Sequence, residues 1–468
     1  MNQYKMLIDG ELVDSSLRMD VVNPANESNA ANIPVASSDD LNRAVAAAKK
    51  AYASWKNTSL EERRDCLSKL VQALDDNSEE LALILTQEQG KTLEDARNEV
   101  MFAGAFASHY LTVDLEPEVL LEDEAQRVEI HRRPLGVVAG ITTWNFPLLI
   151  AVYKIAPAVI TGNAIVIKPA PSTPLATMKF GELIKDIFPA GVINIIADNN
   201  DMGPLLTSHP DVQKVSFTGS TVTGRKIMAS AAPTLKRLTL ELGGNDAAIV
   251  MGDVDVDKVA ESLFGVSFMN SGQVCICLKR MYVHEDIYDQ VCERIAAMAN
   301  AANVGDGMNP NNQFGPIQNK AQYEKVLAFL DDAKSKGTVI AGGEVDDKPG
   351  FNFPLTVVKD IAEGAKMVDE EAFGPILPII KFSNVEDAIK RANASEQGLG
   401  ASVWSSDLDK AQVIAHQLEA GTVWINKHLD FGPHIPFPPA KQSGVGVEWG
   451  KEGMLEFTAM QVVNINKA

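Results

Sequence analysis

The sequence predicts an α/β protein built from a parallel, doubly wound sheet and a second, separate α/β domain. First, short β-branched runs alternate with helical runs between residues 136 and 244. Second, these strand runs are apolar throughout, which is typical of parallel strands covered by helices on both faces. Third, the alternation resumes after residue 246 with different content, and a chain of 468 residues has room for about three domains.

Two helical stretches precede the first sheet. Residues 40–56 and 61–110 carry apolar residues three and four positions apart and are rich in Ala, Leu, Glu, Lys and Arg, as expected of amphipathic helices. The polar, acidic stretch that follows contains VEIHRR, residues 128–133, in which apolar and polar side chains alternate. This period of two indicates an exposed or half-paired strand.

The remaining elements follow from the same two patterns. In the first sheet domain we expect strands over 136–142, 163–169, 192–197, 214–220 and 235–244, with helices over 146–162, 173–188, 202–209 and 221–232. In the second we expect strands over 247–251, 279–284, 375–382, 401–406 and 421–427, with helices over 256–271 and 286–302. An irregular loop rich in proline and glycine, 433–446, leads to an alternating strand in the tail, 457–468.

Composition and charge narrow the possible classes of function. Apolar residues make up 46% and charged residues 22% of the chain, which excludes disordered and fibrous proteins. A net charge of -20 opposes binding to nucleic acid and to anionic membranes, so neither is an expected partner. Polar residues and prolines interrupt the most apolar stretch, 137–167, too often for a bilayer span. With no secretory signal and only four cysteines, we expect a cytoplasmic protein with free thiols.

The segment FMNSGQVCICLKR, residues 268–280, holds the first candidate catalytic residue. A helical pattern stops at Ser271-Gly272, and Cys275 lies just beyond it. A thiol in such a loop, near backbone N–H groups, can be stabilised as a thiolate and stays accessible to substrate. Taken alone, a free cysteine is more often a small core residue, and this is the role that we assign to Cys277 and Cys292. We expect no metal site, because no second ligand pair lies near Cys275 and Cys277.

Two strand ends carry further polar candidates. Glu241 is followed by Gly243-Gly244, so its carboxylate lies at the sheet edge where α/β proteins bind ligands. A loop cap or an ion pair would also explain Glu241. Asn145 precedes Phe146-Pro147 at a helix start, where it is either an N-cap or, through its side-chain amide, a donor to an oxyanion.

Two more strand-to-turn junctions have the chemistry to meet a nucleotide. Lys168 stands at a strand end and could hydrogen-bond a ribose, and Gly219-Ser220 precedes a helix whose N-terminus could face a pyrophosphate. Neither junction matches the common G-x-G-x-x-G fingerprint, and ordinary turn residues are the alternative explanation.

Taken together and in this order, the motifs resemble those of the aldehyde dehydrogenase superfamily, and the resemblance covers essentially the whole chain. The matching segments are TWNFP with Asn145, IKPAPSTP with Lys168, FTGSTVTG, ELGGN with Glu241, NSGQVCI with Cys275, and EAFGP over 371–375. The spacings between them are also those of the family. Several motifs in order at matched spacing are far more specific than any one of them.

The resemblance implies a thiol-based oxidation of aldehydes. Cys275 would attack the aldehyde carbonyl, and the oxyanion would be held by the Asn145 side-chain amide and the Cys275 backbone N–H. Glu241 would activate the water that hydrolyses the thioester. Because this glutamate is present, we expect water rather than coenzyme A as the acyl acceptor and a free carboxylic acid as the product.

The resemblance also implies a Rossmann-like cofactor domain that binds NAD or NADP without the common glycine fingerprint. Lys168 would contact the adenine-side ribose, Ser220 the pyrophosphate, and Glu371 the nicotinamide ribose with Phe373 beside it. The other expected contacts are Trp144, which would line the path to the substrate, and Thr143, Gly219, Gly224 and Leu242. Pro171 stands where strongly NAD-dependent members carry a Glu, so we expect NADP to be accepted as well.

The positions that line the aldehyde tunnel in the family are mostly apolar here and include no arginine. They are Phe146, Leu149, Ile150, Tyr153, Met269, Val274 and the loop over 429–437 with Phe437. We therefore expect hydrophobic aldehydes, either aliphatic or aromatic, since a carboxylated aldehyde would call for an arginine clamp. His428, Asp430 and His434 lie in or beside the same loop, where they are either solvated or in contact with a polar substrate.

The implied architecture has three parts. Residues 1–117 and 135–243 would form the cofactor domain, 244–440 the catalytic domain, and 118–134 with 455–468 a small β oligomerisation flap. Such a flap cannot bury its own surface, so we expect a homodimer or a tetramer. The rivals are a semialdehyde-specific or a coenzyme-A-acylating relative and, from another class, a non-catalytic binding protein on the same fold.

Overall fold

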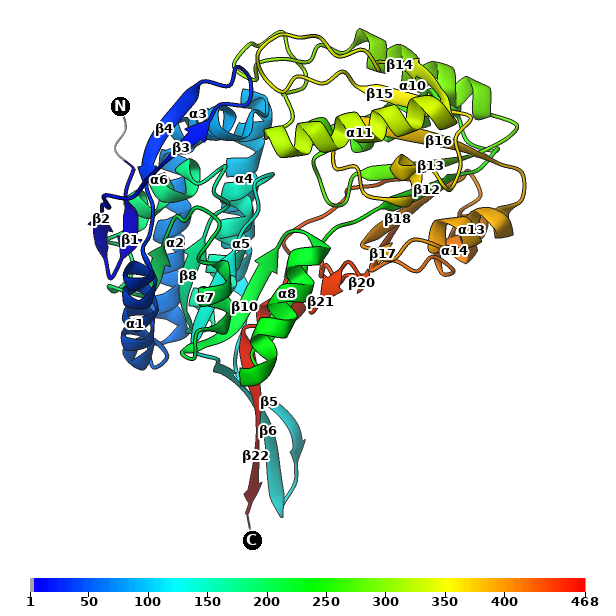
Figure 1. Cartoon of the computed structure of the whole chain (residues 1–468). Coiled ribbons are helices and arrows are strands. Elements are labelled where there is room, and N and C mark those ends of the chain that lie inside the picture. The colour runs from blue at the N-terminus through cyan, green and yellow to red at the C-terminus, as the bar shows by residue number, and fades with distance from the viewer. Residues whose placement is uncertain (1–3, 468) are drawn as a thin grey trace.

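The structure, a computed structural model, describes residues 4–467 and confirms the predicted α/β class (Figure 1). The first sheet runs in the order β2-β1-β9-β8-β7-β10-β11-β21. Its five central strands are parallel, and its edges are antiparallel. The strands are β1 (Met6–Ile8), β2 (Glu11–Val13), β7 (Val137–Ile141), β8 (Ala164–Lys168), β9 (Ile193–Ile195), β10 (Val212–Thr218), β11 (Arg237–Glu241) and β21 (Gly444–Val445).

Helices cover this sheet because its central strands are apolar on both faces. Every residue of β7 and β8 is buried, and so is every residue of α5, which packs between the sheet and the N-terminal helices. The helices are α1 (Ser38–Trp55), α2 (Leu60–Asp76), α3 (Ser78–Gln89), α4 (Leu93–His109), α5 (Pro147–Ile160), α6 (Leu175–Ile184), α7 (Gly203–Ser208) and α8 (Thr221–Ala231). Capping boxes at Ser37 and Ser59 start the first two.

The N-terminus forms two hairpins that the sequence did not predict. One is the pair β1 and β2 at the sheet edge, and the other joins β3 (Arg18–Val22) to β4 (Asn29–Pro34). These strands have three to six residues, too few for a clear alternating pattern.

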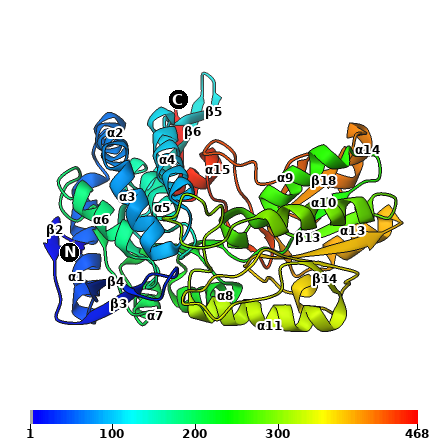
Figure 2. The ribbon, with the colours of Figure 1, turned by 90° about the horizontal axis from the view of Figure 1, so that it is seen from above.

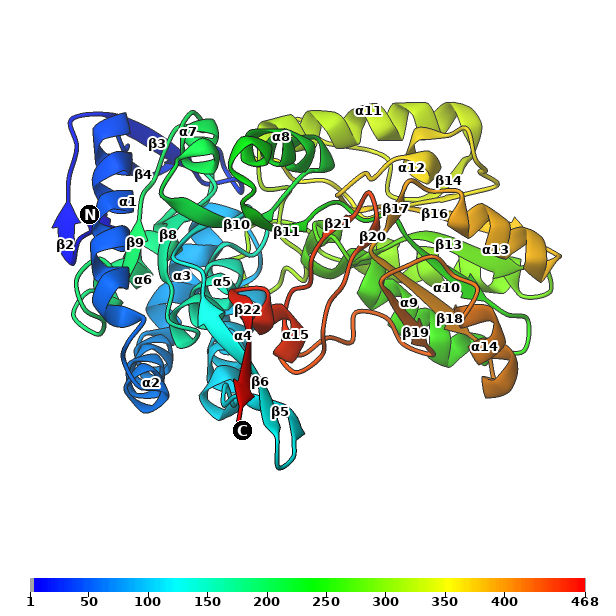
Figure 3. The same ribbon diagram turned by 90° about the horizontal axis from the view of Figure 1, so that it is seen from below.

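The second sheet runs in the order β14-β15-β16-β13-β12-β18-β19 and lies beside the first (Figures 1 and 3). Its strands are β12 (Asp246–Val250), β13 (Leu278–His284), β14 (Thr338–Ala341), β15 (Thr356–Lys359), β16 (Ile376–Phe382), β18 (Gly400–Trp404) and β19 (Thr422–Ile425). The helices are α9 (Val256–Phe268), α10 (Tyr288–Ala301), α11 (Lys320–Lys336), α12 (Lys366–Asp369), α13 (Val385–Asn393) and α14 (Leu408–Ala415). The helix expected over 256–271 ends earlier, at Phe268.

The tail reaches back across the molecule. Short strands β17 (Gln397–Gly398) and β20 (Ala440–Lys441) pair next to the site, and α15 (Gly450–Leu455) leads into β22 (Thr458–Asn466). β22 pairs antiparallel with β6 (Gln126–Pro134), and β6 pairs with β5 (Glu118–Glu122), as a ribbon that projects from the body (Figures 1 and 2). Its exposed apolar side chains are Val119, Leu120, Leu121, Met460, Val462 and Ile465.

The described part of the chain contains no helix with the length and apolar character that a membrane span requires.

A candidate active site between the two sheets

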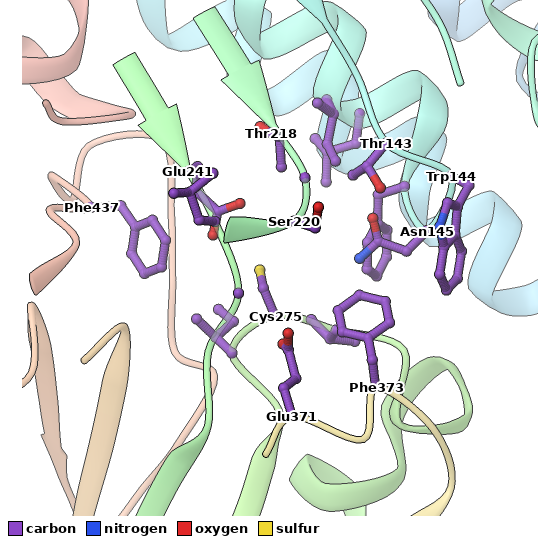
Figure 4. Close-up of a pocket in the computed structure, with 18 of the residues that line it drawn as sticks. Thr143, Trp144, Asn145, Thr218, Ser220, Glu241, Cys275, Glu371, Phe373 and Phe437 are labelled. Carbon is purple, nitrogen blue, oxygen red and sulfur yellow. The ribbon is translucent and has the colours of Figure 1, made fainter. Parts of the chain in front are cut away.

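A cavity of about 210 Å³ lies where the two sheet domains meet, and Figure 4 shows the side chains around it. The first domain contributes the residues that follow β7, β10 and β11. The second contributes the loop after α9 and the loop before β16. The cavity brings together these predicted site residues: Cys275, Glu241, Asn145, Thr143, Trp144, Gly219, Ser220, Leu242, Glu371, Phe373, Phe146, Leu149, Ile150, Tyr153, Met269, Val274 and Phe437.

The Cys275 loop begins with an unusual backbone turn. Asn270, Ser271 and Gly272 all have positive φ, at 50°, 55° and 72°. A Cβ on Gly272 would collide with the Gly374 carbonyl of the neighbouring loop, so only glycine fits there. This turn ends the helix and directs the following residues into the cavity.

Cys275 and Cys277 have different surroundings, as the sequence suggested. Cys275 is partly exposed, and its sulfur points toward Glu241 (Figure 4). Burial inside the cavity, with the nearby Glu241, raises the pKa of the Cys275 thiol well above its usual value, and Lys279 opposes this shift. Cys277 is buried, with its sulfur 3.6 Å from the Met269 carbonyl oxygen.

Glu241 ends β11 with only 4% of its surface exposed. Burial raises the pKa of Glu241 to about 8, although the Cys275 thiol and Lys154 favour the charged form. Among the described residues, its Oε1 has no hydrogen-bond partner. Neither a loop cap nor an ion pair therefore accounts for this carboxyl group.

Behind Glu241, a second buried carboxylate is paired. Lys154 Nζ donates to Glu448 Oε1 at 2.7 Å and to Ser216 Oγ at 2.8 Å. This pair keeps a positive charge close to Glu241 without occupying its oxygens. Glu241 Oε1 therefore keeps no hydrogen-bond partner among the described residues, and the Cys275 sulfur lies on the side of the carboxyl group (Figure 4).

Asn145 does not cap α5. Phe146 is the N-cap and makes no side-chain cap, while Glu99 Oε1 accepts hydrogen bonds from the N–H groups of Leu148 and Leu149. The Asn145 Nδ2 donates to the Gln273 carbonyl at 2.9 Å, which ties it to the Cys275 loop. An amide carries two N–H groups, so one is left for a ligand.

A buried ion pair that the sequence analysis missed holds Asn145 in place. Lys91 Nζ lies 2.5 Å from Glu99 Oε2 and 2.9 Å from the Asn145 carbonyl oxygen, and both side chains are fully buried. Lys91 also lies over the Phe146 ring, 3.9 Å from its centroid. The local sequence offers no clear signal for this pair, because Lys91 lies between α3 and α4, and Glu99 is one of several charged residues of α4.

Glu371 and Phe373 line the cavity from the loop that precedes β16. Glu371 Oε1 accepts a hydrogen bond from the Gly244 N–H at 3.0 Å, and Lys325 Nζ donates to the Glu371 carbonyl at 2.8 Å. Burial raises the pKa of Glu371. The Phe373 ring meets Trp144 edge to face, with centroids 5.2 Å apart.

Three predicted cofactor residues, Lys168, Pro171 and Gly224, do not line this cavity. Lys168 ends β8, and its Nζ lies 2.6 Å from Asp198 Oδ1 in a buried ion pair. Gly224 lets α8 pack against Leu242, since a Cβ there would lie 2.6 Å from Leu242 Cδ2. Ser220 lines the cavity and also caps α8, accepting from the Thr223 N–H at 3.3 Å.

The cavity lining includes Phe431 from the predicted loop 429–437, and it also includes residues that were not predicted, among them Phe102, Ile276 and Trp449. Trp449 stacks on Phe437 with ring centroids 4.6 Å apart. Among the described residues, no arginine lines the cavity. His428 is buried rather than solvated, and its Nε2 lies 2.9 Å from the Ile276 carbonyl oxygen behind the Cys275 loop.

Comparison with known proteins places this geometry in context. The family model described as "Aldehyde dehydrogenase family" matches residues 12–463. A probable aldehyde dehydrogenase of a Pseudomonas species is 41% identical over 467 residues, 99% of this chain and 95% of the relative. The putative aldehyde dehydrogenase FUS7 of Gibberella fujikuroi is 40% identical over 438 residues, 93% of each chain.

A solved structure agrees over the whole fold. An aldehyde dehydrogenase from Bacillus cereus in complex with NAD+ superposes with a TM-score of 0.96 at 34% identity, over 99% of this chain and 97% of that one.

Proposed function

This chain belongs to the aldehyde dehydrogenase family, and from that premise we propose that it oxidises aldehydes to free carboxylic acids with NAD or NADP. The observation that carries the proposal is the meeting of Cys275, Glu241 and Asn145 around one cavity at the domain junction (Figure 4). A nucleophile, a carboxyl group with a raised pKa and an amide donor are the parts that acyl chemistry needs.

In the first step, the Cys275 sulfur attacks the aldehyde carbonyl carbon, and a C–S bond forms as the C=O π bond breaks. The thiol proton leaves toward the adjacent Glu241 carboxylate. The negative charge on the former carbonyl oxygen is held by the free Asn145 N–H and by the Cys275 backbone N–H. Donors of this kind are worth about 3–4 kcal/mol each in the transition state.

The residues present fit a nicotinamide dinucleotide. Gly219 and Ser220 stand at the N-terminus of the 11-residue helix α8, which can bind the pyrophosphate of the dinucleotide. Glu371 lines the same cavity, together with Trp144 and Phe373, and its carboxylate can bind a ribose. Lys168, at the end of a neighbouring strand, supplies a donor for the second ribose. A dinucleotide held by these residues would supply the acceptor for the hydride that is lost when the thiohemiacetal becomes a thioester.

Glu241 then completes the reaction. Once the thiol proton has passed from Glu241 to solvent, the Glu241 carboxylate takes a proton from a water molecule, whose oxygen attacks the thioester carbon. The C–S bond breaks, Glu241 returns its proton to the Cys275 thiolate, and the acid leaves. The pKa of about 8 suits a group that must both accept and release a proton near neutral pH.

For the substrate we propose apolar aldehydes, aliphatic or aromatic. Many of the side chains that line the cavity are aromatic, and the described lining offers no arginine for a substrate carboxylate. The two rival enzyme functions fit less well. A semialdehyde-specific enzyme would need such an arginine clamp, and a coenzyme-A-acylating enzyme would not need Glu241 as a base.

The test is a panel of aldehydes of graded chain length and charge, read as NADH and NADPH formation, with and without coenzyme A. We expect turnover of apolar aldehydes, a free acid as product and loss of turnover in Cys275→Ala. Faster turnover of carboxylated aldehydes, or acyl-coenzyme A as the main product, would favour a rival. No turnover of any aldehyde would favour a binding protein.

We also propose that the projecting ribbon of β5, β6 and β22 is an oligomerisation flap. Its apolar side chains, such as Leu120, Met460 and Val462, are each more than half exposed, and a second copy of the chain would bury them. Light scattering of the parent and of Leu120→Asp tests this proposal, with a smaller particle expected for the variant.

A further inference from the structure

Lys279 is a buried lysine that serves the Cys275 loop. It is the second residue of β13, only 5% exposed, and its side chain turns back toward the loop that precedes the strand. Its Nζ donates to three backbone carbonyls of that loop: Val274 at 2.6 Å, Cys275 at 3.1 Å and Cys277 at 3.4 Å. One ammonium group therefore gathers the carbonyls on both sides of the nucleophile.

The fourth carbonyl of the loop is held by a second side chain. His428 Nε2 lies 2.9 Å from the Ile276 carbonyl oxygen, and its Nδ1 lies 2.9 Å from Ser402 Oγ. Burial lowers the pKa of His428 to about 3, so the ring is neutral. Its Nε2 then carries the proton and donates to the carbonyl. All four carbonyls from 274 to 277 are thus held by these two buried side chains.

This arrangement sets the direction of the Cys275 N–H. The Val274 carbonyl and the Cys275 N–H belong to one peptide unit, and in a trans peptide these two groups point in opposite directions. No cis peptide occurs in the described chain. Because Lys279 holds the Val274 carbonyl, the Cys275 N–H of the same peptide unit points away from the ammonium group. That N–H donates no hydrogen bond to any residue between 4 and 467, and it is left for a ligand.

Lys279 also reaches the opposite wall of the cavity. Its Nζ lies 4.0 Å from Glu371 Oε1 and 5.7 Å from the centroid of the Phe373 ring. The other charged or titratable groups that face it are Asp246, Lys325, His428 and the thiols of Cys275 and Cys277. It is therefore the cation shared by the nucleophile loop and the loop that carries Glu371.

We propose that Lys279 is the positioning residue of the oxyanion site, which aims and polarises the Cys275 N–H and couples the nucleophile loop to Glu371. The proposal rests on the proposed function, because it assigns this N–H to the oxyanion. A cation at the carbonyl end of a peptide dipole makes the N–H at its other end a stronger donor. The same charge stabilises the nearby thiolate.

The experiment compares the parent with Lys279→Met, Lys279→Arg and, as a control, Lys214→Met. Lys214 is an equally buried lysine on β10 that bonds Thr239 and makes no contact with the loop. Three quantities are measured: the pH midpoint of Cys275 alkylation by iodoacetamide without aldehyde or dinucleotide, the kcat and KM for an apolar aldehyde, and the Tm.

We expect Lys279→Met to move the alkylation midpoint to higher pH. It should also lower kcat/KM about 10- to 100-fold, mostly through kcat, since KM reports ground-state binding. Lys279→Arg keeps the charge but cannot place one nitrogen where three carbonyls meet, so its midpoint should stay parental while its kcat falls. Lys214→Met should lower the Tm alone.

The proposal would be overturned if Lys279→Met kept the alkylation midpoint and the kcat/KM of the parent. It would also be overturned if Lys214→Met lost as much kcat/KM as Lys279→Met. If Lys279→Met does not fold, parental kcat in Lys279→Arg overturns it. A parent that oxidises no aldehyde would refute the proposed function and the oxyanion role with it. The alkylation midpoints would still decide whether Lys279 acts on the nucleophile, because they need no turnover.

Discussion

Glu241→Gln is the substitution with the clearest expected consequences for both stability and turnover. Burial raises the pKa of Glu241 from 4.5 to about 8, and each pKa unit corresponds to about 1.4 kcal/mol. Between these two values the folded chain binds a proton that the unfolded chain has lost, so the free energy of unfolding falls as pH rises. The loss reaches at most about 5 kcal/mol above pH 8 and stays constant beyond it.

The glutamine keeps the shape of the side chain but cannot ionise. We therefore expect Glu241→Gln and the parent to be close in stability near pH 4.5, and the variant to become the more stable of the two as pH rises toward 8. Urea unfolding at matched pH values measures this difference. The matched control is Glu448→Gln, which removes a buried carboxylate that is already paired with Lys154 and should destabilise instead.

Turnover should change in the opposite sense. General-base catalysis contributes about 10²- to 10⁴-fold, so steady-state acid formation by Glu241→Gln should fall by that order. At high pH the Cys275 thiol ionises without a base, so Glu241→Gln should still release a burst of one NADH per active site before the slow hydrolysis of the thioester. The parental steady-state rate should rise with pH until about 8. A parental rate in the variant, or a stability difference that does not change with pH, would refute this reasoning.

Three further substitutions test other parts of the site. Lys91→Met leaves the Glu99 carboxylate buried without its partner and should lower the free energy of unfolding by about 3–5 kcal/mol in urea, a loss that adding Glu99→Gln should partly restore. Asp198→Asn removes the negative charge that pairs with Lys168, so kcat/KM with NADP should rise relative to NAD. The exposed Asp201→Asn should leave that ratio unchanged. An unchanged ratio in Asp198→Asn would show that this charge does not affect the choice of cofactor. Cys277→Ser should keep turnover, because its sulfur faces the Met269 carbonyl, and a loss as large as that in Cys275→Ala would reassign the nucleophile.

Local sequence patterns were enough to predict the parallel sheets and the residues at their ends. Apolar runs such as 163–169 are buried on both faces as β8, and the period of three and four over 40–56 forms α1. Glu241 and Asn145 were found because a polar side chain that follows a buried strand lies at the ligand-binding edge. The family of the chain followed from the order of such short motifs, and the comparisons confirm it.

The sequence did not distinguish the roles of single polar residues. It left Asn145 between an N-cap and a donor, and Glu241 between an ion pair and a free carboxyl group. The structure separates these alternatives because Glu99, 46 residues before Asn145, caps α5, and because Lys154 pairs with Glu448 rather than with Glu241.

What the sequence determined by itself is the α/β class and the alternating strands and helices of the first sheet from residue 136 to 244, since these depend on repeating patterns within about twenty residues, while the motifs identified segments that meet at the cavity. What only the tertiary structure decided is which side chains hold that cavity: Lys91 on Asn145, Lys279 on the Cys275 loop, and Phe102 and Trp449 in the lining. Most of these contacts join residues far apart in the chain, and even Lys279 acts through the fold of the loop before it. The energy of such contacts depends on burial and distance, which no local pattern records.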